Sequence, residues 1–258
     1  MGIRFLLIDG LNLIRRVWAA QPGEDGPERL QSAVTSSTQS LARALRECAP
    51  THAVCVLDSG EKGWRHELFP GYKKGRDPMP EILRANIGLF ETAFGESGVS
   101  TLTVPGYEAD DVIATFAVKV AERGGAVIIL STDRIFFQLV SPNIVVRDHF
   151  NKRTMDADYV REKYGILPGR FVDFMALAGD STSTIPGVPL VGPKGAARLI
   201  NEIGALEDIL TVAYTVPGKL GMMLHTHADD ARLSQKLARL DSNIRLGVNL
   251  KSLRYEKT

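Results

Sequence analysis

The stretch PGYEADDVIATF, Pro105–Phe116, places a cluster of carboxylates directly before an apolar helical pattern. The cluster consists of Glu108, Asp110 and Asp111. Acidic residues are favoured in the first turn of a helix, where they face the positive end of its dipole. Helix capping is therefore one interpretation of the cluster, and a cation-binding site is the other. Acidic residues elsewhere in the chain bear on the choice between them.

Short apolar runs, each followed by a helical pattern, recur through the first part of the chain. The runs that predict buried strands are Ile3–Ile8, Thr51–Leu57, Ser100–Val104, Gly125–Leu130 and Asn143–Arg147. Helical periodicity fills the gaps at Leu30–Cys48, Pro80–Ser97, Ala109–Arg123 and Arg134–Val140, and loops are expected at Gln21–Glu28 and Asp58–Asp77. This alternation predicts an α/β domain with a parallel sheet covered on both faces.

From about Met155 the pattern becomes helical, and no strand is expected there. The predicted helices are Asp158–Tyr164, Phe171–Ala178, Gly195–Ile203, Leu206–Ala213 and Asp229–Leu240. Gly and Pro residues concentrate in Gly179–Gly195. We therefore expect an α/β domain over residues 1–154 and a helical region over residues 155–258.

Carboxylates follow the ends of the predicted strands. Asp9, Asp58 and Asp133 end three of the apolar runs, and a fourth run leads into the opening cluster. The carboxyl ends of parallel strands share one edge of a sheet, where sites form. We expect six acids to converge there, and they would repel one another strongly unless a cation neutralised them: Asp9, Asp58, Glu108, Asp110, Asp111 and Asp133.

Oxygen ligands without an accompanying His or Cys cluster suit Mg²⁺, with Mn²⁺ as the alternative, better than zinc. The five histidines show no metal-ligand spacing. Mg²⁺ held by carboxylates typically acts on phosphates. The sequence therefore predicts a divalent-metal site for phosphate chemistry, built partly at a helix N-terminus.

Composition restricts the partners and the location. With 31 basic and 30 acidic residues, net charge alone predicts no polyanionic partner. Two cysteines form no disulfide framework, and the apolar run at the N-terminus is interrupted by Asp9. Neither a signal peptide nor a membrane span is indicated, which favours the cytoplasm.

A basic segment, KGWRHELFPGYKKGRDPMP, lies between the second and third apolar runs and covers residues 62–80. Lysines and arginines alternate there with Trp64, Phe69 and Tyr72. A solvated surface loop is one interpretation. The other is a phosphate-binding segment whose aromatic faces are available to unpaired bases.

A second landmark is GVPLVGPKG, Gly187–Gly195. It departs from a P-loop because Pro193 separates Gly192 from Lys194, and no Ser or Thr follows the lysine. We interpret it as a Gly-rich hairpin that opens a helix near Gly195. Its backbone N–H groups are suited to a DNA phosphate, and its carbonyls to a monovalent cation.

Together these stretches resemble the 5′-nuclease, or flap endonuclease, superfamily over nearly the whole chain. Within the superfamily the chain is most similar to the stand-alone bacterial Xni type. The resemblance is carried by LLIDGLNLIRR, GWRH…YKKGRDPMP, YEADDVIAT, STDRIFFQL and ALAGDSTSTIPGVPLVGPKGAA. It implies a PIN-like α/β domain with a helix-hairpin-helix module, and Mg²⁺-dependent phosphodiester cleavage of branched DNA near a free 5′ end. No small-molecule cofactor and no membrane are involved, and a monomer is expected.

The resemblance also implies roles for individual residues. The six acids match the family's metal-binding motif positions, and Asp110 matches the principal Mg²⁺ ligand of the Xni type. Tyr72, Lys73 and Arg76 match the segment near the scissile phosphate. The DNA-contacting turn corresponds to Leu190, Val191, Gly192, Pro193, Lys194 and Gly195. The K⁺ site of the Xni type corresponds to Leu177, Ala178, Pro186, Val188 and Val191.

Two positions depart from the family pattern. Ile135 and Ser183 stand where active relatives usually carry Asp, and only Asp180 remains of the nearby acids. The first metal site is thus complete and the second depleted, which motivates an alternative, a non-catalytic DNA flap or junction binder. An RNA-cleaving PIN nuclease is disfavoured by the hairpin. A haloacid-dehalogenase-type phosphatase is disfavoured by Leu11, which stands where its second Asp is needed.

Overall fold

A six-stranded sheet organises the N-terminal part of the molecule. The computed structural model describes residues 2–256. The strands lie in the order β3-β2-β1-β4-β5-β6, and all neighbours run parallel except β5 and β6. Their bounds are β1 Arg4–Asp9, β2 His52–Val56, β3 Ser100–Leu102, β4 Ala126–Leu130, β5 Ile144–Asp148 and β6 Arg153–Met155.

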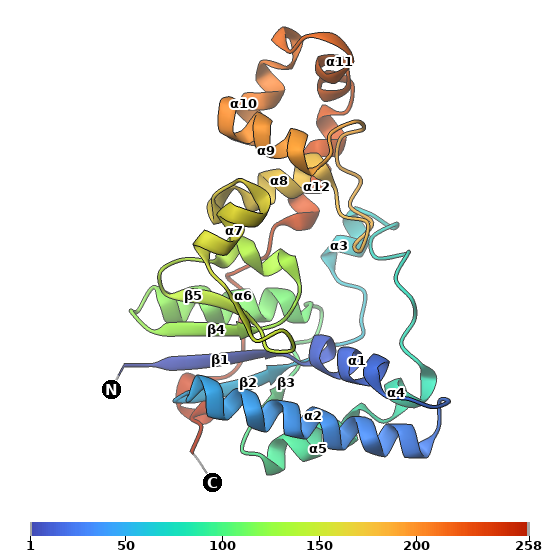
Figure 1. The fold of residues 1–258 in the computed structure, drawn as a ribbon, viewed down its shortest axis with the longest axis vertical. Coiled ribbons are helices and arrows are strands. Elements are labelled where there is room, and N and C mark those ends of the chain that lie inside the picture. Colours follow the sequence, from blue (N-terminus) through green and yellow to red (C-terminus); the bar gives the residue numbers. More distant parts are fainter. Residues whose placement is uncertain (1, 257–258) are drawn as a thin grey trace.

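Helices cover both faces of the sheet, and further helices stand above it along the long axis of the molecule (Figure 1). Around the sheet these are α1 Gly10–Ala20, α2 Pro27–Cys48, α3 Trp64–Leu68, α4 Glu81–Ala85, α5 Ile87–Glu96, α6 Ala109–Ala121 and the 3₁₀ helix η1 Arg134–Leu139. The later elements are α7 Ala157–Tyr164, η2 Pro168–Arg170, α8 Phe171–Ala178, α9 Pro193–Glu202, α10 Leu206–Thr211, η3 Ala213–Thr215, α11 Gly218–Thr226, α12 Ala228–Ala238 and η4 Leu250–Leu253.

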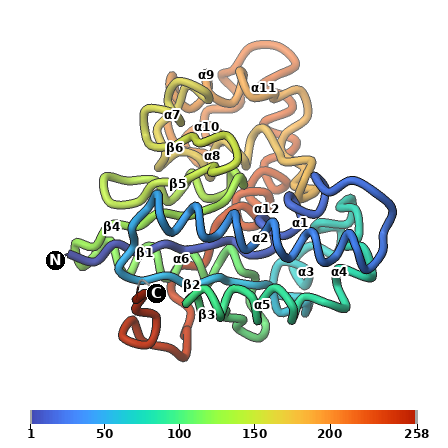
Figure 2. Tube along the Cα trace, turned by 60° about the horizontal axis from the view of Figure 1, so that its bottom comes forward, coloured from blue at the N-terminus to red at the C-terminus, as the bar shows by residue number. Residues whose placement is uncertain are grey.

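Alternate side chains of the central strands feed two hydrophobic cores, as expected for strands buried on both faces. Leu6 and Ile8 pack with α1, α2 and α5, whereas Phe5 and Leu7 pack with α6. Figure 2 shows α2 crossing in front of the sheet with α6 behind it. The core on the α6 side continues into α8, α9 and α12. The sheet and the helical region are therefore joined by shared apolar packing.

The predicted fold class is confirmed: a mostly parallel sheet with helices on both faces, followed by helices. The boundary predicted at residue 154 stays a prediction. Several details were wrong or missed, and the helices α1 and α11 were not predicted. The predicted Asp58–Asp77 loop contains α3, and the predicted Pro80–Ser97 helix is broken at Asn86, whose side chain donates to the Ile82 carbonyl (2.8 Å). The short strand β6 was missed because it lacks an apolar run.

After α12 the chain returns along α6 to the far end of the sheet (Figure 1). We call residues 239–256 the C-terminal strap. The Thr115 hydroxyl donates to the Asp241 carbonyl (3.3 Å), and the Lys119 ammonium donates to the Ile244 carbonyl (3.3 Å). At its end the Tyr255 N–H donates to the Thr51 carbonyl (2.9 Å) beside β2. The strap therefore connects the helical region to the sheet, with hydrogen bonds to α6 near its start and to the residue before β2 near its end.

None of the helices formed by residues 2–256 is long and apolar enough to cross a membrane.

Gly10 allows α1 to begin immediately after β1 while lying against β2. A Cβ at this position would meet the Leu57 Cδ2 at 2.6 Å, the Cys55 Sγ at 2.7 Å and the Val56 carbonyl oxygen at 2.9 Å. The last of these is backbone and cannot swing aside. The Asp-Gly pair at residues 9–10 thus combines a polar side chain at the strand end with a close helix–strand contact.

We expect Gly10→Ala to lower the free energy of unfolding by about 1–3 kcal/mol, the usual effect of overpacking. Gly95→Ala is the matched control, because Gly95 lies in α5 with open space at its Cβ position and alanine favours helices. Urea unfolding at neutral pH checks both variants. Equal stability of Gly10→Ala and the wild type would contradict the close contact.

Candidate active site

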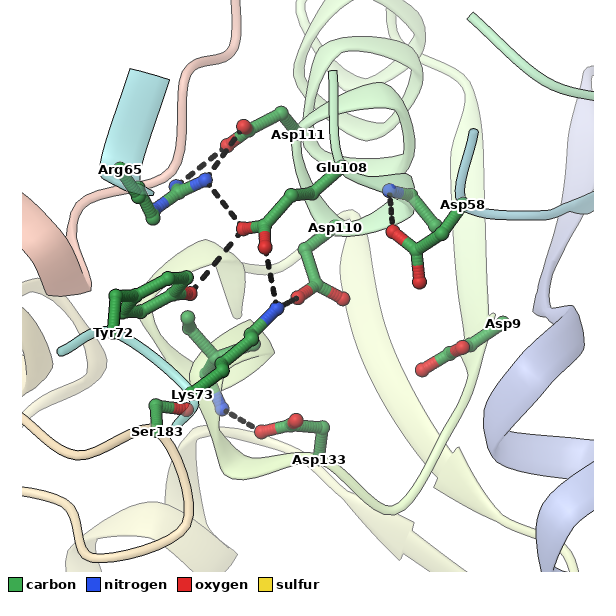
Figure 3. Close-up of polar contacts among 12 residues, drawn as sticks. Asp9, Asp58, Arg65, Tyr72, Lys73, Glu108, Asp110, Asp111, Asp133 and Ser183 are labelled. Carbon is green, nitrogen blue, oxygen red and sulfur yellow. Dashed lines mark hydrogen bonds and ion pairs between the residues drawn. The ribbon is translucent and has the colours of Figure 1, made fainter. Parts of the chain in front are cut away.

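A polar pocket of about 440 Å³ lies at the carboxyl edge of the sheet. Five aspartates line it, one of which, Asp77, comes from a loop. The other four come from separate elements at the sheet edge: Asp9 ends β1, Asp58 follows β2, Asp110 lies in the first turn of α6, and Asp133 precedes η1. Figure 3 shows these four side chains around one open space. Lys73 and Arg76 line the same pocket. The structure thus brings together four of the six predicted acids and two of the predicted basic residues.

Three of the acids are held by hydrogen bonds that cap helices. Asp9 accepts from the Asn12 N–H (3.2 Å) at the start of α1 and from the Ser131 hydroxyl (2.8 Å). Asp58 accepts from the Ala109 N–H (2.8 Å) at the start of α6. Asp133 accepts from the Ile135 N–H (2.9 Å). Capping and pocket formation are therefore combined in the same side chains, because a parallel strand and the helix after it meet at this edge.

Asp110 and Asp111 diverge because consecutive residues on a helix are about 100° apart. Asp110 faces the pocket. Asp111 is completely buried on another side of α6, where its two oxygens form a bidentate pair with Arg65 (2.7 and 2.8 Å). Asp111 therefore lies outside the pocket and already has a counter-ion. The ligand set that we propose below omits it.

Glu108 also lies outside the pocket lining and is paired with cations. Its Oε2 accepts from Arg65 (2.7 Å) and the Tyr72 hydroxyl (3.2 Å), and its Oε1 accepts from the Lys73 ammonium (2.6 Å). Lys73 also lies 3.9 Å from an oxygen of Asp110. Burial opposes ionisation of Glu108, but Lys73 and Arg65 hold its pKa below the ordinary value. Tyr72 is buried, so its hydroxyl orients Glu108 instead of facing the pocket.

Two of the pocket aspartates, Asp9 and Asp110, have raised pKa values, first because of burial and then because of the carboxylates beside them. Burial, followed by the charges of Asp133 and Asp58, raises the pKa of Asp9 to about 7 despite its two hydrogen bonds. Burial and the charges of Asp133, Asp9 and Asp58 raise the pKa of Asp110 well above its usual value, although Lys73 opposes this. Such shifts are typical of carboxylates that share a site.

The donors fit a hard divalent cation by their chemistry. They are carboxylate oxygens on one rim, and Lys73, Arg76, Arg15 and Arg16 line the same pocket. The side chains nevertheless stand apart. Within residues 2–256, no three acidic, His or Cys side chains are close enough together to hold one ion as they stand. Their caps and the nearby lysine account for this spacing, because each carboxylate is attached to its own element.

The depletion of a second metal site stays a prediction, and the structure shows how the three residues concerned are held. Asp180 is buried and paired with Arg134 (2.6 Å), and it also accepts from the Ser183 N–H (3.1 Å). Ile135 is buried in the core on the α6 side. The Ser183 hydroxyl accepts from Arg76 (3.3 Å). Arg134 thus neutralises Asp180, the acid that remains there.

Several residues of the pocket wall were missed from the sequence. Asn12, Arg15 and Arg16 contribute from α1, and Asp77 and Thr182 contribute from loops. Arg15 donates to the Asp77 carbonyl (2.8 Å) and Arg16 to the Thr132 hydroxyl (3.3 Å). The sequence did contain a signal for the residues of α1. A helix that begins directly after the first strand has its first turns at the same edge of the sheet, so Asn12, Arg15 and Arg16 lie near Asp9.

A loop follows α8 and leads into the Gly-rich hairpin Gly187–Gly195, which opens α9. Gly179 and Gly187 both have positive φ (72° and 68°), and a Cβ on Gly187 would lie 2.5 Å from the Gly179 nitrogen. The two backbones can touch only because both residues are glycine. At the tip, Leu190 has φ 69° and is 72% exposed. Lys194 is exposed in the first turn of α9.

The predicted potassium residues surround this backbone contact. The Leu177 carbonyl accepts from the Val188 N–H (2.8 Å), and the Val188 carbonyl accepts from the Val191 N–H (3.0 Å). Each carbonyl oxygen retains a second lone pair. Ala178 adjoins Gly179, and Pro186 adjoins Gly187. The arrangement keeps carbonyl groups at a tight turn, which is the type of ligand expected for a monovalent cation.

The acidic edge of the parallel sheet and the attached helical hairpin define a metal-dependent nuclease of the 5′-nuclease class. The chain belongs to the 5′-3′ exonuclease family. Residues 4–165 match the model described as the 5′-3′ exonuclease N-terminal resolvase-like domain. Residues 166–258 match the 5′-3′ exonuclease C-terminal SAM fold.

Sequence relatives agree with this assignment, and a solved structure shares the fold. The chain is 42% identical over 257 residues to flap endonuclease Xni of Photobacterium profundum, covering 99% of this chain and 98% of the relative. It is 42% identical over 253 residues to flap endonuclease Xni of Aeromonas salmonicida, covering 97% and 96%. A bacteriophage T5 flap endonuclease solved with DNA and metal ions shares the fold, with a TM-score of 0.76 at 23% identity over 93% of this chain and 90% of that one.

Because the pKa of Asp9 is raised, we expect the free energy of unfolding of the metal-free protein to depend on pH. The folded state binds the Asp9 proton more tightly than the unfolded state, whose Asp pKa is about 3.9. Stability therefore falls as the pH rises from about 4 to about 7. We expect metal-free Asp9→Asn to be more stable than the wild type by about 1–3 kcal/mol at pH 8 and equally stable at pH 4. Thermal unfolding in EDTA at both pH values checks this.

Asp158→Asn, which changes an exposed acid on α7, is the control and should show no such pH dependence. Added Mg²⁺ should stabilise the wild type at pH 8 by mass action, and Asp9→Asn much less. A stability difference that is the same at pH 4 and pH 8 would contradict the raised pKa of Asp9, which burial and the neighbouring carboxylates cause.

Proposed function

We propose that the protein is a structure-specific 5′ flap endonuclease that hydrolyses phosphodiester bonds in branched DNA near a free 5′ end, during replication or repair. One observation carries the proposal: four aspartates from separate elements share a pocket with Lys73 and Arg76. Family membership and the flap endonuclease relatives support it. We further propose that the protein works as a monomer in the cytoplasm, without a small-molecule cofactor.

Asp9, Asp58, Asp110 and Asp133 are the proposed ligands of Mg²⁺, with Mn²⁺ as a substitute. Bound Mg²⁺ would supply Lewis acidity at the scissile phosphate. Lys73 and Arg76 face the same space and would donate hydrogen bonds to the phosphate oxygens as charge develops there. Tyr72 would act through Glu108, because its hydroxyl contacts that carboxylate.

The hairpin would hold the duplex through its backbone. Gly192, Lys194 and Gly195 carry backbone N–H groups at the start of α9, beside the Lys194 side chain. Phosphate contacts of this kind carry no base sequence. The exposed Leu190 at the tip adds an apolar contact surface. K⁺ at the carbonyls of Leu177, Ala178, Pro186, Val188 and Val191 would add a positive charge beside the phosphates. Recognition would therefore depend on DNA shape and on salt concentration.

The pairing of Asp180 with Arg134 supports a second candidate function, a DNA flap or junction binder that does not cleave. On that side of the pocket the remaining acid is already neutralised, and Ile135 and Ser183 supply no carboxylate. The two functions differ in one outcome: a binder retains its affinity for flap DNA but gives no product with Mg²⁺ or Mn²⁺.

We expect a 5′-labelled flap DNA to be cut in Mg²⁺ and left intact in EDTA. Asp110→Asn should lower kcat by about 10²–10³-fold, because it removes a charge that faces the pocket. Asp158→Asn, at an exposed site, should leave kcat unchanged. Product quantification on denaturing gels measures this. Equal cleavage in EDTA, or a fully active Asp110→Asn, would refute the metal-dependent mechanism.

We expect Lys194→Ala to weaken binding of flap DNA similarly for unrelated sequences, and to reduce the slope of log K against log salt by about 1. Fluorescence anisotropy across a salt series measures both, with Lys236→Ala on α12 as a control for a basic residue outside the hairpin. A repeat in Li⁺ at equal ionic strength tests the K⁺ proposal. Identical affinities in K⁺ and Li⁺ would remove potassium from the model.

A further inference from the structure

Arg65 is a buried arginine whose hydrogen-bonding capacity is fully used. Its side chain is 1% exposed and packs against Trp64, with the guanidinium carbon 4.4 Å from the ring centre. Nε donates to the Leu237 carbonyl (2.9 Å), and Nη2 donates to the Arg239 carbonyl (2.9 Å) and to Asp111 (2.8 Å). Nη1 donates to Asp111 and to Glu108, both at 2.7 Å. All five N–H groups therefore have partners.

These partners come from parts of the chain that are far apart in sequence. Arg65 lies in α3, Asp111 and Glu108 at the start of α6, and residues 237 and 239 at the end of α12 and the beginning of the strap. Asp111 also accepts from the Asp241 N–H (2.9 Å). Arg65 thus joins the basic segment, the acidic cluster and the helical region at one point, as Figure 3 shows for the first two.

Glu108 carries this constraint to the pocket. It has one oxygen on Arg65 and the other on Lys73, whose ammonium lies 2.6 Å from Oε1. Lys73 has a left-handed backbone conformation (φ 57°), and its N–H donates to the Ser183 carbonyl (3.0 Å). Both ends of Lys73 are therefore fixed, the backbone by the loop before the hairpin and the ammonium by Glu108.

We propose that Arg65 is a positioning residue for the reaction: by fixing Glu108 it holds the Lys73 ammonium beside Asp110. Asp111 serves the same network and is not a metal ligand. The proposal rests on the proposed nuclease function only for its kinetic consequence. The geometric consequence, the location of Lys73, holds for metal-free protein as well.

Arg65→Lys tests the proposal, because lysine keeps the charge but lacks the planar fork that engages both carboxylates. We expect kcat on flap DNA to fall about 10–100-fold, with KM within about twofold, the usual effect of losing a side chain that orients a site. In metal-free protein, acylation of Lys73 by an amine-reactive ester should become several-fold faster, as measured by mass spectrometry.

Thr115→Val is the matched control. Thr115 is buried on the same helix and binds the strap at Asp241 and Ile244, without touching Glu108 or Lys73. It should lower the melting temperature while kcat and Lys73 acylation stay within about twofold of the wild type. Equal losses of kcat in Thr115→Val and Arg65→Lys would show that Arg65 is merely structural and would overturn the proposal.

Glu108→Gln keeps the proposal testable if Arg65→Lys does not fold, since it leaves the Arg65–Asp111 pair intact. It should also expose Lys73 to acylation, and unchanged acylation would overturn the proposal. A wild type that cuts no flap DNA would refute the proposed function, whereas the acylation comparison would still decide the role of Arg65. The two failures are therefore distinguishable.

Discussion

Repulsion among carboxylates at one edge of a sheet is the constraint on which the rest of the structure depends. Parallel strands bring Asp9, Asp58 and Asp133 to the same edge as Asp110, and burial strengthens their interaction. The fold limits the repulsion in two ways. Backbone N–H groups at helix N-termini donate hydrogen bonds to the aspartates. The ammonium of Lys73, from the basic segment, lies 3.9 Å from an oxygen of Asp110. These charges lower the stability of the metal-free protein, and they also suit the pocket to a divalent cation.

Two neighbouring aspartates of α6 have different roles: Asp111 makes contacts within the fold, and Asp110 is available to a ligand. Residues 111, 115 and 119 form one stripe that binds Arg65 and the C-terminal strap. Asp110 lies outside this stripe and faces the pocket. Two adjacent aspartates of identical chemistry thus have different partners, only because a helix rotates between them. The buried Arg65–Asp111 pair satisfies both groups, which is the condition under which a buried ion pair is tolerated.

Sequence patterns could predict the sheet and the acidic edge, because buried strands and capping acids leave local signals. Asp9, Asp58, Asp110 and Asp133 were predictable for that reason. The positions of Glu108 and Asp111 were not, since they depend on Arg65, whose partners include carbonyls more than 170 residues away. The short helix α3 gives no periodic signal, because burial of Arg65 and not an apolar stripe places it. Arg15 and Arg16 escaped prediction because α1 was not recognised as a helix.

The return path of the C-terminal strap affects how the protein is made. Arg65 and Asp111 are synthesised early, but their remaining partners lie at residues 237–241. During translation the sheet and α6 emerge from the ribosome well before those residues. In a nascent chain, Arg65 and Asp111 therefore stay incompletely paired until residues 237–241 have been synthesised. The hydrogen bonds of Arg65 are therefore completed only after every residue that lines the acidic pocket has been synthesised.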